Sequence, residues 1–114
     1  MRPGGIGPVD TTRRVPLRIV DDTDRADAAP GDAMVLVGHD GAMTGYAFRC
    51  PGCGVENYLP LRAMTDRPHA PKWDVTAGDP RTGAGLTLSP SIHHAAPRGC
   101  GWHGWLRDGV LVPC

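Results

Sequence analysis

Two pairs of potential metal ligands are the residues of this sequence whose types and spacing most clearly indicate chemistry. Two residues separate Cys50 from Cys53, and two residues separate Cys100 from His103. Zinc prefers four sulfur or nitrogen donors at tetrahedral corners, and a tight turn with two intervening residues directs two side chains at one ion. The spacing therefore predicts a structural zinc site made by Cys50, Cys53, Cys100 and His103.

The identity of the fourth ligand depends on the C-terminal hairpin. The Asp-Gly pair at 108–109 is a strong signal for a two-residue turn, which places His103 opposite Cys114. Cys114 is therefore an alternative fourth ligand, and it would make the site all cysteine. We favour His103, because ordering a terminal residue costs more conformational entropy. Disulfides are less favoured, because nothing in the sequence indicates an oxidising compartment.

Catalytic uses of the same residues are less well supported. A zinc deaminase needs a His-x-Glu before its cysteine pair, whereas Glu56 follows Cys53. His93 and His94 precede Cys100 as the catalytic histidine does in some His-Asn-His nucleases, but the companion acidic and asparagine positions are missing. We therefore interpret the two histidines as a surface or core-edge pair near the metal.

The segment Ser89-Pro90-Ser91-Ile92 contains two candidate nucleophiles. A catalytic serine needs an acid–base partner, and none can be placed beside these residues from the sequence. The two hydroxyls are therefore expected to cap a turn through hydrogen bonds to the backbone, with Ile92 in the core.

Short strands and turns are expected to dominate the fold. Glycine (16 residues) and proline (12 residues) are abundant, which is typical of turns and short strands rather than long helices. Strands are expected over 15–20, 33–38, 44–49, 55–61, 72–76, 85–88, 105–107 and 110–112. The sequence thus predicts an all-β, zinc-ribbon-like fold in which two ligand-bearing hairpins surround one metal.

The length of 114 residues is enough for one domain with a modest core. Residues 1–14, rich in glycine and proline, are expected to be a flexible arm, and residues 15–114 to form the single domain. Residues 21–32 carry five aspartates and one arginine, which predicts a solvated acidic loop. A cation site in this loop is less favoured, because the regular spacing of a calcium loop is missing.

Charge and hydropathy limit the partners and the location. The formal net charge is zero, so a general electrostatic attraction to nucleic acid or to an anionic membrane is not expected, although a local patch could still bind nucleic acid. No apolar run follows Arg2 as in a signal peptide, and no segment approaches the ~20 apolar residues of a membrane helix. These features favour the cytosol, or packaging in a particle, as the location.

Several motifs occur in a specific order between Val35 and Val112. They are Cys50-Pro51-Gly52-Cys53-Gly54, Trp73, the segment 86–92, Cys100-Gly101-Trp102-His103 and the segment 106–110. This order resembles a small zinc-ribbon family that is common in bacteriophage and bacterial genomes and is often mislabelled "ammonia monooxygenase" in phages. The mislabelled chemistry belongs to membrane-embedded copper enzymes, and this sequence has neither a membrane span nor a histidine-rich copper site.

The resemblance implies a metal site of three cysteines and one histidine and a compact β fold, with no established activity. Some bacterial relatives lie near ubiquitin-like conjugation genes, which implies a protein partner. From the resemblance and the closed ligand set we favour a zinc-binding, phage-type adaptor module that binds another protein over an enzyme. A virion or assembly component and a metal-dependent His-Asn-His-like nuclease are the alternatives.

Overall fold

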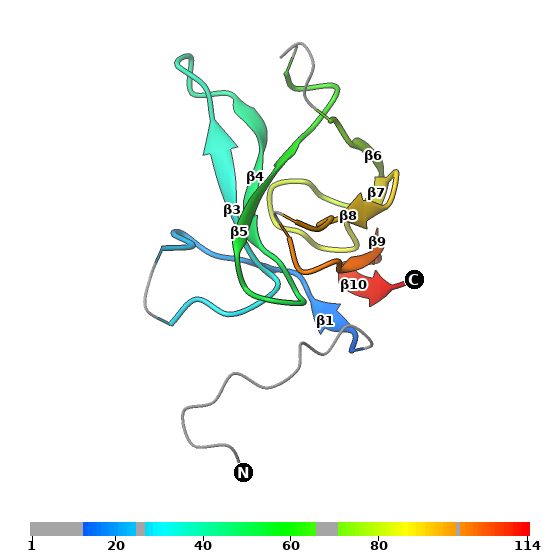
Figure 1. Cartoon of the computed structure of the whole chain (residues 1–114). Helices are drawn as coiled ribbons and strands as arrows, with labels where there is room; N and C mark the ends of the chain where they lie inside the picture. Colours follow the sequence, from blue (N-terminus) through cyan, green and yellow to red (C-terminus); the bar gives the residue numbers. More distant parts are fainter. Residues whose placement is uncertain (1–12, 25–26, 66–70, 98) are drawn as a thin grey trace.

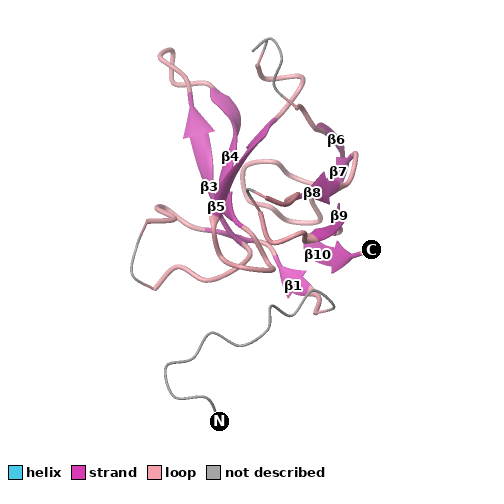
Figure 2. Ribbon diagram, viewed as in Figure 1, coloured by secondary structure: helices cyan, strands magenta, loops and turns pink. Residues whose placement is uncertain are grey.

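The computed structural model describes residues 13–24, 27–65, 71–97 and 99–114, so most of the expected N-terminal arm lies outside the described residues. Within these ranges the chain forms ten strands and no helix (Figure 2). The strands are β1 (Val15–Pro16), β2 (Arg18–Ile19), β3 (Asp32–Val37), β4 (Met43–Arg49), β5 (Glu56–Pro60), β6 (Asp74–Ala77), β7 (Thr87–Ser89), β8 (Ile92–His93), β9 (His103–Arg107) and β10 (Val110–Pro113). The expected all-β fold is confirmed, and the described part of the chain contains no helix able to cross a membrane.

The strands form two four-stranded sheets and one two-stranded ribbon (Figure 1). The first sheet has the order β1-β10-β9-β8, the second has the order β2-β3-β4-β5, and β6 pairs with β7. The single strand expected over 15–20 is therefore divided between the two sheets. Pro16 lies in the edge strand β1, where its missing N–H breaks no ladder.

The core is built from residues of both sheets and of the ribbon. It includes Tyr46 and Phe48 of β4, Leu88 of β7, and Leu106 of β9. Three consecutive residues of β4, at positions 46–48, are buried, so both faces of this strand are covered. The strand that leads to Cys50 is therefore packed on both faces.

The ribbon of β6 and β7 departs from one expectation. Alternation over 72–76 predicted that Trp73 and Val75 face inward, but all of β6, including Val75, is exposed. Within the described residues β6 contacts no strand other than β7, so no second layer imposes alternate burial there. Trp73 precedes β6 and does pack against the core.

Asp32 is not part of a solvated acidic loop, which corrects one expectation for residues 21–32. It is the first residue of β3, and its side chain is only 4% exposed. Its carboxylate accepts hydrogen bonds from Arg18 Nε (2.9 Å) and Nη2 (2.8 Å) and from the Ala29 backbone N–H (2.9 Å). These charge-assisted bonds offset the cost of burying the carboxylate. Asp21, Asp22 and Asp24 are exposed.

Acid should weaken the Arg18–Asp32 pair. The hydrogen bonds from Arg18 hold the pKa of Asp32 below its ordinary value. The stabilisation is therefore fully present above the unfolded pKa of about 3.9 and is lost as the pH falls through the folded value. We expect Asp32→Asn to lower the melting temperature at pH 7, and the deficit relative to wild type to shrink below about pH 4. Circular dichroism would measure this, with Asp21→Asn as the exposed control; a deficit that stays constant with pH would contradict the prediction.

Candidate functional site

The first ligand turn lies at the end of the β4–β5 hairpin. The backbone N–H of Cys50 donates to Val55 O (2.9 Å), and that of Gly54 donates to Cys50 O (2.8 Å), which closes a tight turn. Within it the Gly52 N–H points at Cys50 Sγ (3.3 Å). Gly54 has a φ of +78°, which favours glycine. The turn therefore brings Cys50 and Cys53 to the same side of the hairpin tip.

Arg49 holds this turn from outside. Its Nε donates to Thr23 O (2.8 Å) and its Nη1 donates to Gly54 O (2.9 Å). Arg49 thus connects the 21–24 segment to the first ligand turn.

The second ligand turn connects β8 to β9. The His94 N–H donates to Trp102 O (2.8 Å), and the Gly101 N–H donates to His94 O (2.8 Å), so the β8–β9 ladder extends beyond the strands. A further bond from Gly99 N–H to Ala95 O (2.9 Å) tightens the loop between them. His94 and Cys100 therefore belong to the same hairpin tip.

The two turns meet and form a cluster of four potential metal donors. Donor atoms of Cys50, Cys53, His94 and Cys100 all lie within 4.8 Å of one another. Cys50 Sγ is 3.6 Å from Cys100 Sγ, and Cys53 Sγ is 3.7 Å from His94 Nδ1. Donors about 2.3 Å from a central ion at tetrahedral corners are about 3.8 Å apart. The cluster therefore fits a four-coordinate metal ion, and none of its cysteines forms a disulfide.

Close packing holds the two turns together. A Cβ added to Gly52 would lie 2.8 Å from Cys100 Sγ and 3.0 Å from Trp102 Cβ. Only glycine fits at this point of contact without a shift of the neighbouring atoms. Trp102 is buried against it, 1% exposed, and covers the side of the cluster toward the core.

The structure places His94, not His103, beside the three thiols, which corrects the predicted ligand set. Side chains alternate between the two faces along β8 and β9 and along the ladder that extends them. Ile92, His94 and Trp102 point inward, whereas His93 and His103 point outward and are exposed. His103 thus lies on the opposite face from the cluster. Cys114, the alternative ligand, is exposed and lies outside the cluster, although its N–H does bond His103 O (2.9 Å), as the expected hairpin register requires.

Burial and hydrogen bonds shift the pKa values of the Cys50 and Cys100 thiols in opposite directions. Burial raises the pKa of the Cys50 thiol to about 12. Partial burial also disfavours the thiolate form of Cys100. Hydrogen bonds from the Trp102 N–H and from Cys50 outweigh this effect and lower the pKa of Cys100. A metal ion must therefore displace a proton from Cys50, so metal affinity should fall as the pH falls.

A second group of polar side chains lies on the outer face of the same hairpin. Ser91 Oγ is 2.8 Å from His103 Nε2. Ser91 is half-buried and His103 is exposed, so both can be reached from solvent. In the tautomer that leaves Nε2 unprotonated, the hydroxyl donates its proton toward the ring. This is the contact by which a histidine activates a nucleophilic serine.

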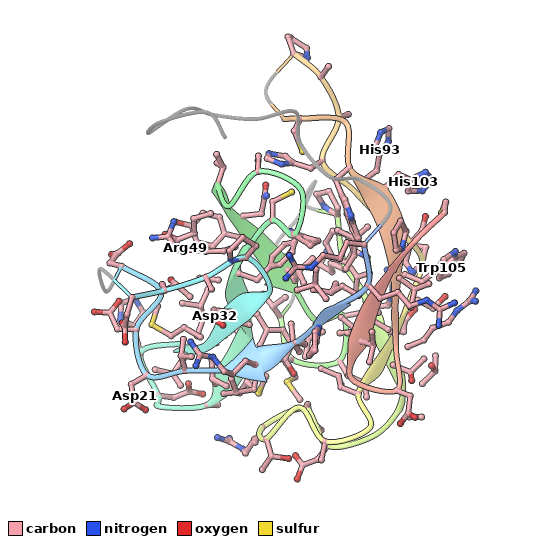
Figure 3. The ribbon with its side chains drawn as sticks, turned by 90° about the horizontal axis from the view of Figure 1, so that it is seen from below. Asp21, Asp32, Arg49, His93, His103 and Trp105 are labelled. Atoms are coloured by element: carbon pink, nitrogen blue, oxygen red, sulfur yellow. The ribbon has the colours of Figure 1, made fainter. Side chains whose placement is uncertain are left out.

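His93 packs against the ring of His103. The two residues are directly opposite in the β8–β9 ladder, and their ring centroids are 4.7 Å apart with an interplanar angle of 33°. Figure 3 shows the two rings side by side, with Trp105 farther along the same sheet. The guanidinium of Arg107 lies 4.7 Å from the centre of the Trp105 ring. His93 therefore restricts the orientation of His103 from one side.

The sequence contained a partial signal for this pair. The sequence offers Ser91 as a candidate nucleophile without a partner and predicts that His103 binds the metal, so it does not indicate a contact between the two side chains. Side chains alternate between the two faces along each strand. If Ile92 and Trp102 point inward, their neighbours Ser91 and His103 point outward, on the same face. The pairing of Ile92 with Gly104 could not be predicted, because the loop between the strands has no recognisable turn motif.

The fold and the two sites define a class: a small all-β protein that carries a Cys3His cluster on one side of a hairpin and a Ser–His pair on the other. The family model described as "Bacterial ubiquitination-like system serine protease (BubE)" matches residues 19–114, and the chain belongs to this family. The match begins inside β2 and includes all the residues of both sites. No curated protein and no solved structure matches the chain.

Proposed function

We propose that this chain is a serine hydrolase in which Ser91 is the nucleophile and His103 is the general base. The observation that carries the proposal is the 2.8 Å contact between Ser91 Oγ and His103 Nε2 on an accessible face. Membership of a family described as serine proteases supports it independently of the geometry. The role previously considered for Ser91, turn capping through the backbone, does not account for a side-chain contact with histidine.

The chemistry follows from the two atoms in contact. Ser91 Oγ forms a bond to the acyl carbon of the substrate while His103 Nε2 takes the hydroxyl proton, and that proton then passes to the leaving group as the scissile bond breaks. Water next attacks the acyl-serine with His103 again as the base, the carboxylic acid is released, and the proton returns to Ser91 Oγ. No oxidant, reductant or further reactant is needed.

His93 acts as a positioning residue. Its ring lies against His103 rather than against Ser91. Directly opposed residues without ladder bonds have the closer side chains in an antiparallel pair, which explains why the two rings meet. This contact limits the rotation of the His103 ring and keeps Nε2 directed at Ser91.

We further propose that the Cys3His cluster holds zinc in a structural role. Three thiolates and an imidazole are a common zinc ligand set, and four protein donors leave no coordination position open for substrate. Cys50, Cys53, His94 and Cys100 would hold the ion and join the β4–β5 and β8–β9 hairpins. In this proposal the zinc ion takes no part in the hydrolysis.

The family description suggests the substrate class. It refers to bacterial ubiquitination-like systems, so we propose that the chain cleaves a peptide-type acyl bond in a ubiquitin-like protein or its conjugates. The adaptor and virion roles expected from the sequence stay alternative proposals. The nuclease hypothesis used His94 as a possible catalytic residue, and the position of its Nδ1 beside the thiols gives His94 another role.

Labelling with an alkyl fluorophosphonate, which needs no knowledge of the substrate, tests the proposed function. We expect stoichiometric modification of the wild type, mapped to Ser91 by mass spectrometry, because the reagent reacts with activated serines. Ser89→Ala should be labelled like wild type, and His103→Ala should react far more slowly. Wild-type protein that contains the metal and remains unlabelled would show that Ser91 is not an activated nucleophile.

A further inference from the structure

A hollow lies beside Ser91, between the open edges of β5 and β8. Its volume is about 50 Å³, and its lining includes Asn57, Tyr58, Leu59, Trp73, Ile92 and His93. The Trp73 indole N–H donates to the backbone carbonyl oxygen of Ser91 (3.3 Å), so one wall of the hollow contacts the main chain of the residue that carries the proposed nucleophile. A substrate group in this hollow would therefore lie next to Ser91.

The edge of β5 presents unpaired backbone groups to this hollow. β5 is the last strand of its sheet. In the β4–β5 ladder, Leu61 N–H bonds Thr44 O and Cys50 N–H bonds Val55 O. Bonded and non-bonded pairs alternate in an antiparallel ladder, so the Ala47–Tyr58 pair is non-bonded. The N–H and C=O of Tyr58 therefore point away from β4.

The far end of the same edge already accepts an extended segment. Trp73 N–H donates to Pro60 O (2.9 Å), and Arg62 N–H donates to Trp73 O (2.8 Å), in a parallel bridge between Leu61 and Trp73. Within the described ranges, no backbone group pairs with Tyr58 on its outer side. The β5 edge is thus free next to the hollow and closed beyond it by Trp73.

The opposite wall of the hollow has the same character. β8 is the last strand of the other sheet, and His93 lies in a non-bonded pair with His103, because the adjacent pair, His94 with Trp102, is bonded. The backbone of His93 therefore also points outward. Two open strand edges that flank one hollow are suited to an extended peptide and not to a compact ligand.

We propose that the acyl-side segment of the substrate binds as an added strand along β5, with its main chain hydrogen-bonded to the N–H and C=O of Tyr58. This inference rests on the proposed hydrolase function and names how its substrate is held. The segment stays attached to Ser91 in the acyl-enzyme, so the same contacts position it for both steps. The Tyr58 ring, 62% exposed, offers apolar surface to the bound strand.

A set of peptide probes tests this binding mode on the wild-type protein. N-acetyl-tetra-alanyl diphenyl phosphonate should label Ser91 faster than the mono-alanyl probe. Single N-methyl groups placed along the tetra-alanyl probe should slow labelling about five- to tenfold at alternate positions only, because a strand bonds to its neighbour through every second residue. Equal effects at all positions, or no effect at any, would overturn the proposal.

Two variants test whether the substrate strand pairs with β5. Tyr58→Pro removes the outward N–H without removing a ladder bond, whereas Tyr58→Ala keeps it. We expect Tyr58→Pro to lose about five- to tenfold of the tetra-alanyl labelling rate, and Tyr58→Ala to lose less. The melting temperature and the metal content of both variants should match wild type, which shows that each variant is folded.

The two proposals fail in different ways. If the alkyl probe does not label wild type, the hydrolase proposal fails. If the alkyl probe labels Ser91 but the tetra-alanyl probe has no advantage, or Tyr58→Pro and Tyr58→Ala react alike, only the added-strand proposal fails.

Discussion

Removal of the metal is expected to unfold the protein. The ion would join two hairpin tips that also meet where Gly52 contacts Cys100 and Trp102. Binding of a structural zinc contributes on the order of 10 kcal/mol or more, which is comparable to the whole stability of a small domain. Without it, Cys50 and its neighbouring thiols would remain as a partly buried polar cluster.

Chelation and a matched pair of cysteine variants would measure this. Cys50→Ser should lose the metal and the cooperative thermal transition, whereas Cys114→Ser, which changes an exposed cysteine outside the cluster, should keep both. His94→Ala and His103→Ala form a second pair, and only the first should reduce the metal content. Elemental analysis and circular dichroism would follow both properties. A Cys50→Ser protein that melts like wild type would refute the structural role of the metal.

Loss of Ser91 or His103 is expected to abolish hydrolysis while leaving the fold intact. On a p-nitrophenyl ester, we expect Ser91→Ala and His103→Ala each to lower kcat/KM by about 10³-fold or more, since the nucleophile and its base act as one unit. For the same reason the double variant should lose no more activity than either single variant. Ser89→Ala, two residues away, is the control.

The melting temperature and the metal content separate this effect from misfolding. Both properties should match wild type in Ser91→Ala and His103→Ala, because the two side chains lie on the face opposite the cluster. Near-additive losses in the double variant would mean that Ser91 and His103 do not cooperate. A Ser91→Ala protein with wild-type activity would show that Ser91 is not the nucleophile.

The parts of the fold and of the sites that depend on short-range signals were predictable. The Asp-Gly turn at 108–109 established the β9–β10 register and the position of Cys114 opposite His103. The Cys50–Cys53 turn and its flanking strands follow from turn chemistry and alternation, and both were expected.

What could not be predicted depends on pairing across a loop. The expected ligand set took the second pair from sequence spacing, but the donor that joins Cys100 comes from across the loop, at His94. Short strands such as β8 give weak periodic signals, so the pairing that sets His94 beside Cys100 and His93 beside His103 was not predicted. The burial of Asp32 was missed for the same reason, because its partner Arg18 lies in another two-residue strand.

The β8–β9 hairpin carries His94 and Cys100 at its tip and Ser91 and His103 on its outer face. If both proposals hold, cellular zinc supply decides how many newly made molecules become active. In a metal-starved cell the chain would accumulate in an inactive form and would be exposed to degradation, so enzyme abundance would follow nutrient status without any dedicated inhibitor.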